Sequence, residues 1–309
     1  MKRVAFMFSG QGSQYTGMGK NLHDRFVECR RIFDFASEVL GINMRKLCFD
    51  SDSHTLDQTV NTQPAVHIIS ICALSLLHKY RIFPSAVAGY SLGEYAALYA
   101  SGVFGLTETL YLISRRAHAM QQAYDDAYGM GVISGHDMQK VEALCARREN
   151  VWVANYNTPA QVSISGRKDA IQGVFDELDR MGGYRTMFLP VGGAFHTKMM
   201  LPAVELFSKD IKPVIPKKNT VPVVMNTTGT YLDERCDIKK MMLEHMVTPV
   251  RWSDSIETLL SSGIEVFIEL GPGDTLSKYV VAIAGDRKID IFHISDTQSL
   301  SQTVNYLYG

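Results

Sequence analysis

The chain has 309 residues, and 31 Lys and Arg against 32 Asp and Glu give a formal net charge of −1. This length suggests about two domains, and a hydrophobic share of 46% is that of an ordinary globular protein. The near-neutral total excludes a general nucleic-acid binder but allows a local basic patch for one acidic partner.

The cysteines and the N-terminus exclude several other classes. Five cysteines are scattered without paired C-x-x-C spacing, which indicates neither a metal site nor a disulfide framework, so we interpret them as idle thiols in a reducing cytosol. The apolar run after Met1-Lys2-Arg3 is too short for a secretory signal. The longest mostly apolar stretch, Val66 to Leu77, falls short of the roughly 20 residues that a membrane span needs. We therefore expect a cytoplasmic protein without membrane contact.

The first third of the chain alternates short apolar runs with helical sequence. Val4 to Phe8 predicts a buried strand that ends in the loop Ser9-Gly10-Gln11-Gly12. The pattern then predicts mostly helical sequence to about Leu47, a loop from Asp50 to Thr59, a long helix from Gln63 to Tyr80, a strand from Ala86 to Gly89 and a helix from Leu92 to Ala100. This alternation is typical of a parallel sheet with crossover helices.

The pattern changes after about Tyr124. Short strands are predicted at Met130 to Ser134, Val151 to Ala154, Gln161 to Ser165 and Tyr184 to Leu189, with helices at Met138 to Arg148 and Lys168 to Met181. The order β-α-β-β-α-β is that of a ferredoxin-like unit. We therefore predict an inserted α+β subdomain over residues 125–190, within an α/β catalytic domain made of residues 1–124 and 191–309.

The α/β pattern resumes from Leu201. Strands are predicted at Val221 to Met225 and Val266 to Leu270, a helix at Ser253 to Ser262, and a strand-like run at Ile289 to Ile294.

Gly89-Tyr90-Ser91-Leu92-Gly93 fits the pattern G-x-S-x-G between a predicted strand and a predicted helix. In that context the small residues permit a sharp turn that presents the serine hydroxyl, and the helix N-terminus offers N–H groups to an anion. The alternative is a glycine-rich turn whose serine only caps the helix.

A serine nucleophile needs a base, and the chain has nine histidines. His196 follows a predicted strand and the flexible segment Gly192-Gly193-Ala194-Phe195, which places it on a loop at a strand end. Spacing favours it only modestly over His245 or His293. The loop at Gly10 fails the dinucleotide pattern G-x-G-x-x-G because Tyr15 occupies the third position, but it could lend an N–H to an oxyanion hole.

Six ordered motifs resemble those of the malonyl-CoA:acyl-carrier-protein acyltransferases over nearly the whole chain. They are Phe8-Ser9-Gly10-Gln11-Gly12-Ser13-Gln14 with Thr62-Gln63-Pro64-Ala65, the serine motif, Arg116 with Met120-Gln121, Asn155-Tyr156-Asn157-Thr158-Pro159-Ala160-Gln161, Gly193-Ala194-Phe195-His196, and Thr248-Pro249-Val250-Arg251-Trp252 with Glu269-Leu270-Gly271-Pro272-Gly273. The family's fold is a hydrolase-like α/β domain with an inserted ferredoxin-like domain, which agrees with the predicted elements.

The resemblance implies a role for each matching residue. Ser91 would be the acylated nucleophile and His196 its base, and the main-chain N–H groups of Gln11 and Leu92 would form the oxyanion hole. Arg116 would bind the free carboxylate of the acyl group in a bidentate manner. Without the resemblance, Arg116 is one of two adjacent arginines on a helix and would be interpreted as solvated.

Three positions depart from the family pattern. Tyr90 replaces a common histidine, which puts the acyl group's exact identity in question, and Ser9 replaces a proline. His245 stands where many members have a glutamine whose main-chain carbonyl holds the catalytic histidine. Phe195 before His196 is typical of malonyl-type members. We count Tyr90, Phe195, Asn155, Gln161 and His245 as further pocket candidates.

The resemblance implies a discrete, trans-acting and monomeric enzyme of fatty-acid or polyketide biosynthesis. It would move a malonyl or related dicarboxylic acyl group from CoA to the phosphopantetheine thiol of an acyl carrier protein, with acyl-CoA as substrate and no cofactor or metal. One alternative is a hydrolase that clears stalled acyl groups from carrier proteins, which Tyr90 keeps open. Another is a non-catalytic scaffold.

Overall fold

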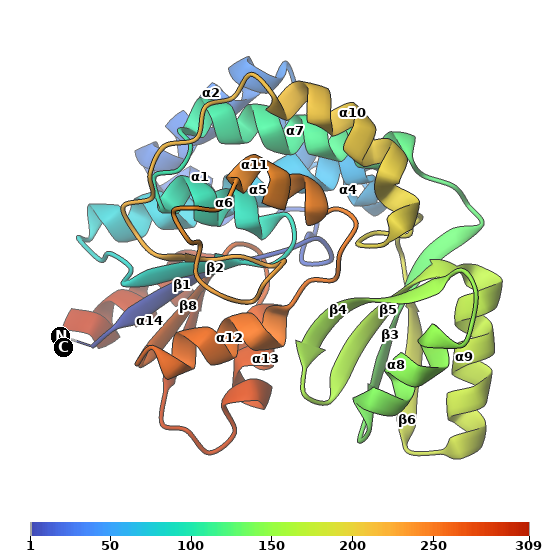
Figure 1. The fold of residues 1–309 in the computed structure, drawn as a ribbon. Helices are drawn as coiled ribbons and strands as arrows, with labels where there is room; N and C mark the ends of the chain where they lie inside the picture. Colours follow the sequence, from blue (N-terminus) through green and yellow to red (C-terminus); the bar gives the residue numbers. More distant parts are fainter. Residues whose placement is uncertain (1, 309) are drawn as a thin grey trace.

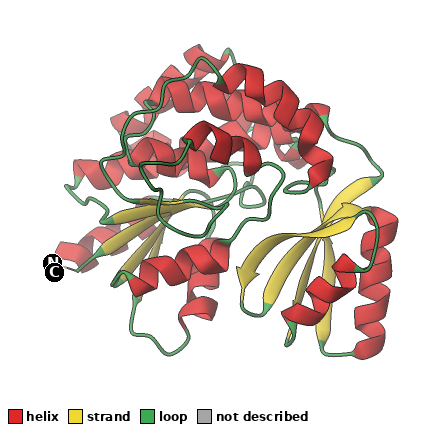
Figure 2. Ribbon diagram, viewed as in Figure 1, coloured by secondary structure: helices red, strands yellow, loops and turns green. Residues whose placement is uncertain are grey.

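The computed structural model describes residues 2–308, and its strands form two separate sheets (Figures 1 and 2). The larger sheet is five-stranded and every neighbouring pair in it is parallel. Its order is β7-β2-β1-β8-β9, built from β1 (Val4–Phe8), β2 (Ala86–Gly89), β7 (Val223–Val224), β8 (Val266–Leu270) and β9 (Asp290–Ile294). Consecutive parallel strands need crossover connections, and helices supply them.

The parallel sheet is buried on both faces. Along β1, the side chains of Val4, Phe6 and Phe8 enter one apolar cluster, whereas Ala5 and Met7 enter another. The first cluster includes residues of α5 (Thr59–Lys79), α6 (Gly93–Ala100) and α7 (Leu106–Gln122), and the second includes α12 (Trp252–Ser261) and α13 (Thr275–Ala284). Figure 1 shows these two helical layers above and below the sheet. Burial on both faces explains why the sequence of a strand such as β1 is a continuous run of apolar residues.

The remaining helices complete the larger body. They are α1 (Lys20–Arg25), α2 (Val27–Leu40), α3 (Met44–Phe49), α4 (Ser53–Asp57), α10 (Leu201–Ile211), α11 (Ile238–Glu244) and α14 (Thr297–Tyr308), with a 3-10 turn at Lys198–Met200. The helix α4 lies inside the segment for which the sequence predicts a loop. The Asp52 side chain accepts a hydrogen bond from the Thr55 N–H and so caps this short helix.

The helix α5 is longer than the sequence pattern predicts. It begins four residues earlier, at Thr59, and continues through Pro64 to Lys79. Among the described residues it is long and apolar enough to cross a membrane by length and composition alone, but 83% of its most apolar window is buried inside the protein. It is therefore a core helix, and its apolar surface is covered by neighbouring elements.

The smaller sheet is antiparallel, with the order β4-β5-β3-β6. Its elements are β3 (Tyr128–Gly135), α8 (Met138–Ala146), β4 (Val151–Thr158), β5 (Gln161–Arg167), α9 (Lys168–Met181) and β6 (Tyr184–Leu189). Apolar residues of α8 and α9 pack with those of the strands in a core of their own. The predicted β-α-β-β-α-β order and the fold class are confirmed.

The smaller sheet is joined to the larger body at two places. The chain leaves and returns side by side, because a Cβ placed on Gly192 would overlap the ring of Tyr124 at 1.7 Å. In addition, β4 makes main-chain hydrogen bonds with Val250, which donates to the Ala154 carbonyl and accepts from the Tyr156 N–H. Figure 1 shows the smaller sheet as a separate lobe beside the larger one.

Candidate active site

A sharp turn between β2 and α6 carries Ser91. Its φ of 52° lies in the left-handed region that side chains other than glycine seldom adopt. Glycines on either side make the turn possible: a Cβ on Gly89 would lie 2.0 Å from the Gly93 carbonyl carbon, and one on Gly93 would lie 2.1 Å from the Phe8 oxygen. The structure therefore has the strained turn expected from the G-x-S-x-G pattern, with Ser91 9% exposed.

His196 reaches this serine from the loop after β6. Its Nε2 lies 2.8 Å from the Ser91 Oγ, and its Nδ1 lies 2.8 Å from the main-chain carbonyl oxygen of His245. A carbonyl can only accept, so Nδ1 carries the proton and Nε2 is left to accept the serine hydroxyl proton. His293, which spacing alone left as an alternative, instead lies on β9.

The surroundings keep the His196 imidazole neutral. Burial is the main cause that lowers its pKa well below the ordinary histidine value, and the nearby His245 and Arg116 lower it further. A neutral imidazole can act as a base, whereas an imidazolium cannot.

The two predicted oxyanion donors flank the serine. Leu92 follows it directly, just before α6. Gly10 lies against the same turn, because a Cβ on it would be 2.7 Å from the Tyr90 carbonyl oxygen, and this brings Gln11 beside the serine. Neither the Gln11 nor the Leu92 main-chain N–H has a hydrogen-bond acceptor among residues 2–308. Both are thus free to bind an oxyanion.

Arg116 lies on α7 and is buried, with 1% of its surface exposed. One guanidinium nitrogen donates to Gln63 Oε1 at 2.7 Å and another donates to Ser91 Oγ at 3.3 Å. Within the described part of the chain, no carboxylate forms an ion pair with it, and its Nε has no hydrogen-bond partner. The solvated alternative is wrong for Arg116, whereas its neighbour Arg115 is partly exposed and pairs with Asp210.

Tyr90 connects the serine turn to the smaller sheet. Its hydroxyl donates to Asn157 Oδ1 on β4 at 2.6 Å, and its ring packs edge-on against Trp252. Asn157 Nδ2 in turn donates to Gln161 Oε1 at 3.1 Å. Gln161, a pocket candidate, therefore supports this contact and does not bond to Ser91 or His196.

The other pocket candidates occupy different places around the pair. Phe195 is 6% exposed and its ring packs beside Gly193, where a Cβ would come within 2.4 Å of it. Asn155 is buried on β4 beside Val250. His245 holds His196 through its carbonyl, and its own ring stacks on the His196 ring with centroids 5.0 Å apart.

Four residues at the site carry no assigned role in the sequence prediction: Gln63, Glu94, Asn157 and Asn226. Gln63 and Asn157 lie inside the motifs quoted above, and Glu94 directly follows the serine motif, so the sequence drew attention to these positions. Asn226 follows the two-residue strand β7, and only the tertiary structure brings it to the serine turn, where its Oδ1 accepts from the Ser91 N–H at 2.8 Å.

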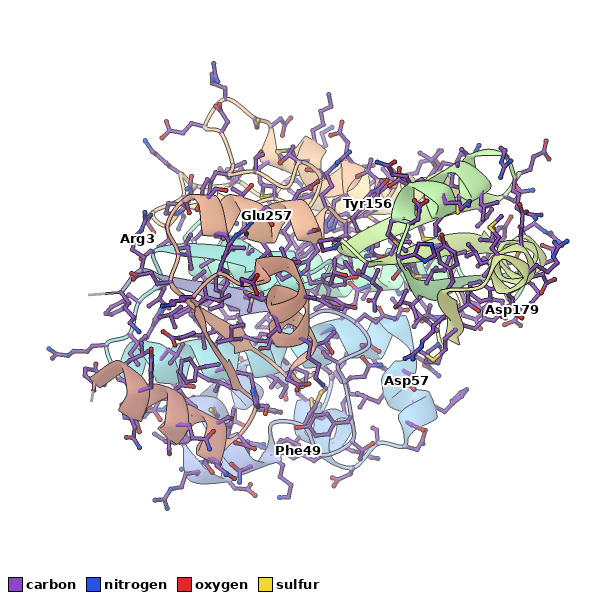
Figure 3. The ribbon with its side chains drawn as sticks, turned by 90° about the horizontal axis from the view of Figure 1, so that it is seen from below. Arg3, Phe49, Asp57, Tyr156, Asp179 and Glu257 are labelled. Atoms are coloured by element: carbon purple, nitrogen blue, oxygen red, sulfur yellow. The ribbon has the colours of Figure 1, made fainter. Side chains whose placement is uncertain are left out.

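Two cavities border the smaller lobe, and one of them reaches His196. One of about 1040 Å³ lies between the α4–α5 region and the smaller lobe, with Asp57, Gln121 and Lys168 in its lining. The other, of about 410 Å³, is lined by His196, Tyr156 and Lys198. Figure 3 labels Asp57 and Tyr156, which in this view lie on opposite sides of the boundary between the two lobes. No group of three or more His, Cys, Asp or Glu residues in the described chain is placed to hold a metal ion.

Taken together, the site combines an activated serine, a neutral imidazole, two free N–H donors and a buried cation. The first three are the parts needed for covalent acyl transfer through an acyl-serine. The buried guanidinium can form charge-assisted hydrogen bonds with a carboxylate that enters the site.

Comparisons with known proteins agree with this chemistry. Residues 5–288 match the family described as acyl transferase domain. The malonyl CoA-acyl carrier protein transacylase of Bacillus subtilis (strain 168) is 33% identical over 312 residues, which cover 99% of this chain and 98% of that protein. The polyketide biosynthesis malonyl CoA-acyl carrier protein transacylase BaeC of Bacillus velezensis is 36% identical, covering 92% of this chain and 97% of that one.

Solved structures show the same similarity. The malonyl CoA-acyl carrier protein transacylase of Clostridium perfringens superposes with a TM-score of 0.94 at 32% identity, covering 99% of this chain and 97% of that chain. A malonyl-transacylase in complex with its type II polyketide-synthase acyl carrier protein has a TM-score of 0.93 at 29% identity, covering 98% and 99% of the two chains.

Proposed function

The chain belongs to the acyl transferase family, and from this we propose that it moves a malonyl group from CoA to the phosphopantetheine thiol of an acyl carrier protein. The observation that carries the proposal is Arg116, a buried guanidinium without a carboxylate partner in the described chain, 3.3 Å from the Ser91 hydroxyl. An acyl group with a free carboxylate supplies the missing anion. Both relatives are named malonyl CoA-acyl carrier protein transacylases, and one of them is named for polyketide biosynthesis.

In the first half-reaction, Ser91 Oγ attacks the thioester carbonyl while His196 Nε2 accepts the hydroxyl proton. The carbonyl oxygen becomes an oxyanion that the N–H groups of Gln11 and Leu92 bind. When the tetrahedral intermediate collapses, the carbon–sulfur bond breaks and His196 returns the proton to the CoA sulfur. The products are malonyl-Ser91 and free CoA.

In the second half-reaction, the carrier thiol gives its proton to His196 and attacks the acyl-serine carbonyl. The ester bond to Ser91 breaks, and the proton on His196 goes back to Oγ. The acyl group leaves on the carrier, and the enzyme returns to its starting state. No step needs a cofactor, and acyl-CoA enters as a substrate.

Arg116 sets the acyl specificity in this proposal. Its guanidinium can form two parallel hydrogen bonds with the malonyl carboxylate, while Gln63 holds it from the other side at 2.7 Å. An acetyl group would leave the buried cation unpaired. Phe195 and Asn155 complete the acyl pocket, and Tyr90 with Gln161 supports it through Asn157.

We also propose the organisation of the protein around this reaction. Residues 1–124 and 191–309 form the catalytic domain and residues 125–190 form the inserted subdomain. The protein acts as a discrete, trans-acting monomer in the cytoplasm, where both CoA esters and carrier proteins are available.

The hydrolase alternative is not favoured. A hydrolase that clears uncharged acyl groups has no use for a buried cation next to the nucleophile, and the relatives compared above are named transacylases. A scaffold without catalysis is also disfavoured, because the serine and histidine lie in hydrogen-bond contact.

Intact mass spectrometry tests the proposal. Wild-type protein mixed with malonyl-CoA should gain the mass of one malonyl group, and the adduct should disappear when a carrier protein in its phosphopantetheine form is added. The Ser91→Ala variant should gain nothing. A wild-type protein that stays unmodified, or an adduct that water removes faster than the carrier does, would contradict the proposal. A panel of fatty-acid and polyketide carriers would show which pathway the enzyme serves.

A further inference from the structure

Three buried polar residues lie behind the serine and the histidine without a role in the proposed chemistry. Glu94 and Asn226 are fully buried, and His245 is 1% exposed. Burying polar and ionisable groups costs free energy unless they find partners. The contacts that these three side chains make therefore indicate their role in the protein.

Asn226 holds the strained turn from behind. Its Oδ1 accepts from the Ser91 N–H at 2.8 Å, and its Nδ2 donates to the Gly89 carbonyl at 2.6 Å. The two bonds clamp the main chain on either side of Tyr90. Because Ser91 has a positive φ, such a clamp keeps the turn from relaxing.

Glu94 holds Asn226 in place. It lies in the first turn of α6, where the helix dipole favours a carboxylate, and its Oε2 accepts from the Asn226 N–H at 2.6 Å. The serine side of the pair thus depends on this carboxylate through a single intermediate residue.

The second oxygen of Glu94 points to the histidine side. Oε1 lies 3.3 Å from His245 Nδ1, a contact whose geometry does not make a hydrogen bond. His245 is the residue whose carbonyl oxygen accepts from His196 Nδ1, and its ring stacks on the His196 ring at an interplanar angle of 32°. Among residues 2–308 this close approach to Glu94 is the one polar contact of the His245 side chain.

We propose that Glu94 is a positioning residue that orients both members of the Ser91–His196 pair from one buried carboxylate. It acts on Ser91 through Asn226 and on His196 through His245. A displacement of about 1 Å between reacting groups can cost about 100-fold in rate. A residue that holds both Ser91 and His196 in place should therefore increase the rate of acylation. The inference rests on the proposed function.

The test is single-turnover acylation by malonyl-CoA, measured by rapid quench and intact mass. Glu94→Gln keeps an oxygen that can accept from the Asn226 N–H but removes the charge that faces His245. We expect the acylation rate at saturating malonyl-CoA to fall about 10- to 100-fold. The malonyl-CoA concentration at half-saturation should stay nearly constant, because the contacts of Arg116 are unchanged.

The matched control is Glu244→Gln, which removes a carboxylate one residue before His245 that is 48% exposed. It should acylate at the wild-type rate. His245→Gln keeps the main-chain carbonyl but removes the imidazole, and we expect a smaller loss. The Glu94→Gln and His245→Gln effects should not add in the double variant, because both alter the same contact between the Glu94 carboxylate and the His245 imidazole.

Several outcomes would overturn the inference. A folded Glu94→Gln variant that acylates at the wild-type rate would do so, as would a loss confined to the half-saturating concentration or additive effects in the double variant. If Glu94→Gln does not fold, a wild-type rate in His245→Gln overturns it. Failure of the proposed function is distinct, because the wild-type protein itself would then form no acyl-enzyme.

Discussion

Arg116 carries its charge in the protein interior, and within residues 2–308 its guanidinium donates hydrogen bonds only to the neutral side chains of Gln63 and Ser91. Burial lowers its pKa from the ordinary arginine value, but that value is so high that the group stays protonated. A buried charge without a counter-ion is unfavourable. Binding of an anion at Arg116 should therefore be favourable, which supports the proposed role of this side chain in acyl selection.

Arg116→Ala should lower kcat/KM for malonyl-CoA by at least about 100-fold, because breaking a buried ion pair costs about 3–5 kcal/mol. Acetyl-CoA should lose much less, so the preference shifts toward uncharged acyl groups. The measurement is acyl-enzyme formation with both esters. Arg115→Ala, next in the chain but paired with Asp210 at the surface, is the control and should behave like wild type. Unchanged discrimination in Arg116→Ala would contradict the assignment.

His196 should remain an effective base at unusually low pH. Burial lowers its pKa well below the ordinary value of about 6.5, and the nearby His245 and Arg116 lower it further, so protonation disables it only in more acidic solution. In a plot of kcat/KM for acylation against pH, the decline on the acidic side should therefore have its midpoint well below pH 6.5. A pH–rate profile checks this, with His118→Gln, which lies outside the site and bonds Gln122, as control. A midpoint at or above about pH 6.5 would contradict the lowered pKa of His196.

At the scale of elements, α5 shows how the core supports the site. The helix supplies Gln63, which holds Arg116, and Ser70, which bonds the Leu270 carbonyl at the end of β8. One turn beyond Gln63 lies His67, fully buried and without a hydrogen-bond partner among residues 2–308. Burial lowers the pKa of His67 to about 3, so the folded protein keeps it neutral.

This histidine should make stability depend on pH. Between about pH 6.5 and 3 the unfolded chain binds the proton and the folded chain does not, so its contribution is complete above 6.5 and is lost as pH falls. The loss should approach ~1.4 kcal/mol per pH unit in the middle of that range.

Urea unfolding of wild type and His67→Leu at neutral and acid pH measures this effect. As the solution becomes acidic, the free energy of unfolding should decrease less in His67→Leu than in wild type, whatever the absolute stabilities of the two proteins. His78→Leu, a half-buried histidine near the end of the same helix, serves as the comparison and should show a weaker change. Parallel pH dependences in wild type and His67→Leu would show that His67 does not carry the effect.

At the scale of the whole molecule, the two lobes share the site. The larger lobe provides the serine turn and Arg116, and the smaller one meets it through Tyr90–Asn157 and through the main-chain bonds of β4 to Val250. The two chain ends also meet, since Lys2 donates a hydrogen bond to the hydroxyl of Tyr306 (Figure 1). The elements of the smaller lobe, β3 to β6, lie in sequence between β2 and β7 of the larger sheet.

Replacing residues 125–190 by a short Gly-Ser linker should leave the larger lobe folded, because Tyr124 and Gly192 already lie in contact and the smaller sheet has its own core. We expect cooperative thermal unfolding to persist but acylation of Ser91 to drop to background, since β4 no longer covers the site. Circular dichroism and intact mass measure the two properties. Retained acylation would mean that the smaller lobe serves only carrier recognition, and loss of the folded state would contradict the independence of the larger lobe.

Local sequence determined much of this protein. Apolar runs of four to five residues mark β1 and β2, and β8 is apolar except for Glu269, because strands buried on both faces need no alternation. The G-x-S-x-G spacing identified Ser91, because only glycines fit two residues on either side of so tight a turn. The β-α-β-β-α-β order of the inserted lobe followed from periodicity, and the family resemblance pointed to His196 and Arg116.

Other features are decided only by the tertiary structure, because they join residues far apart in the chain. Helix α4 was missed since its cap is a single aspartate, and β7 is shorter than predicted since only Val223 and Val224 pair with β2. Glu94 contacts Asn226, which is 132 positions away in the sequence, and His245, which is 151 positions away. Whether Arg116 is solvated or buried likewise depends on which elements pack over α7. A local sequence pattern does not specify how far apart two elements lie in the folded protein.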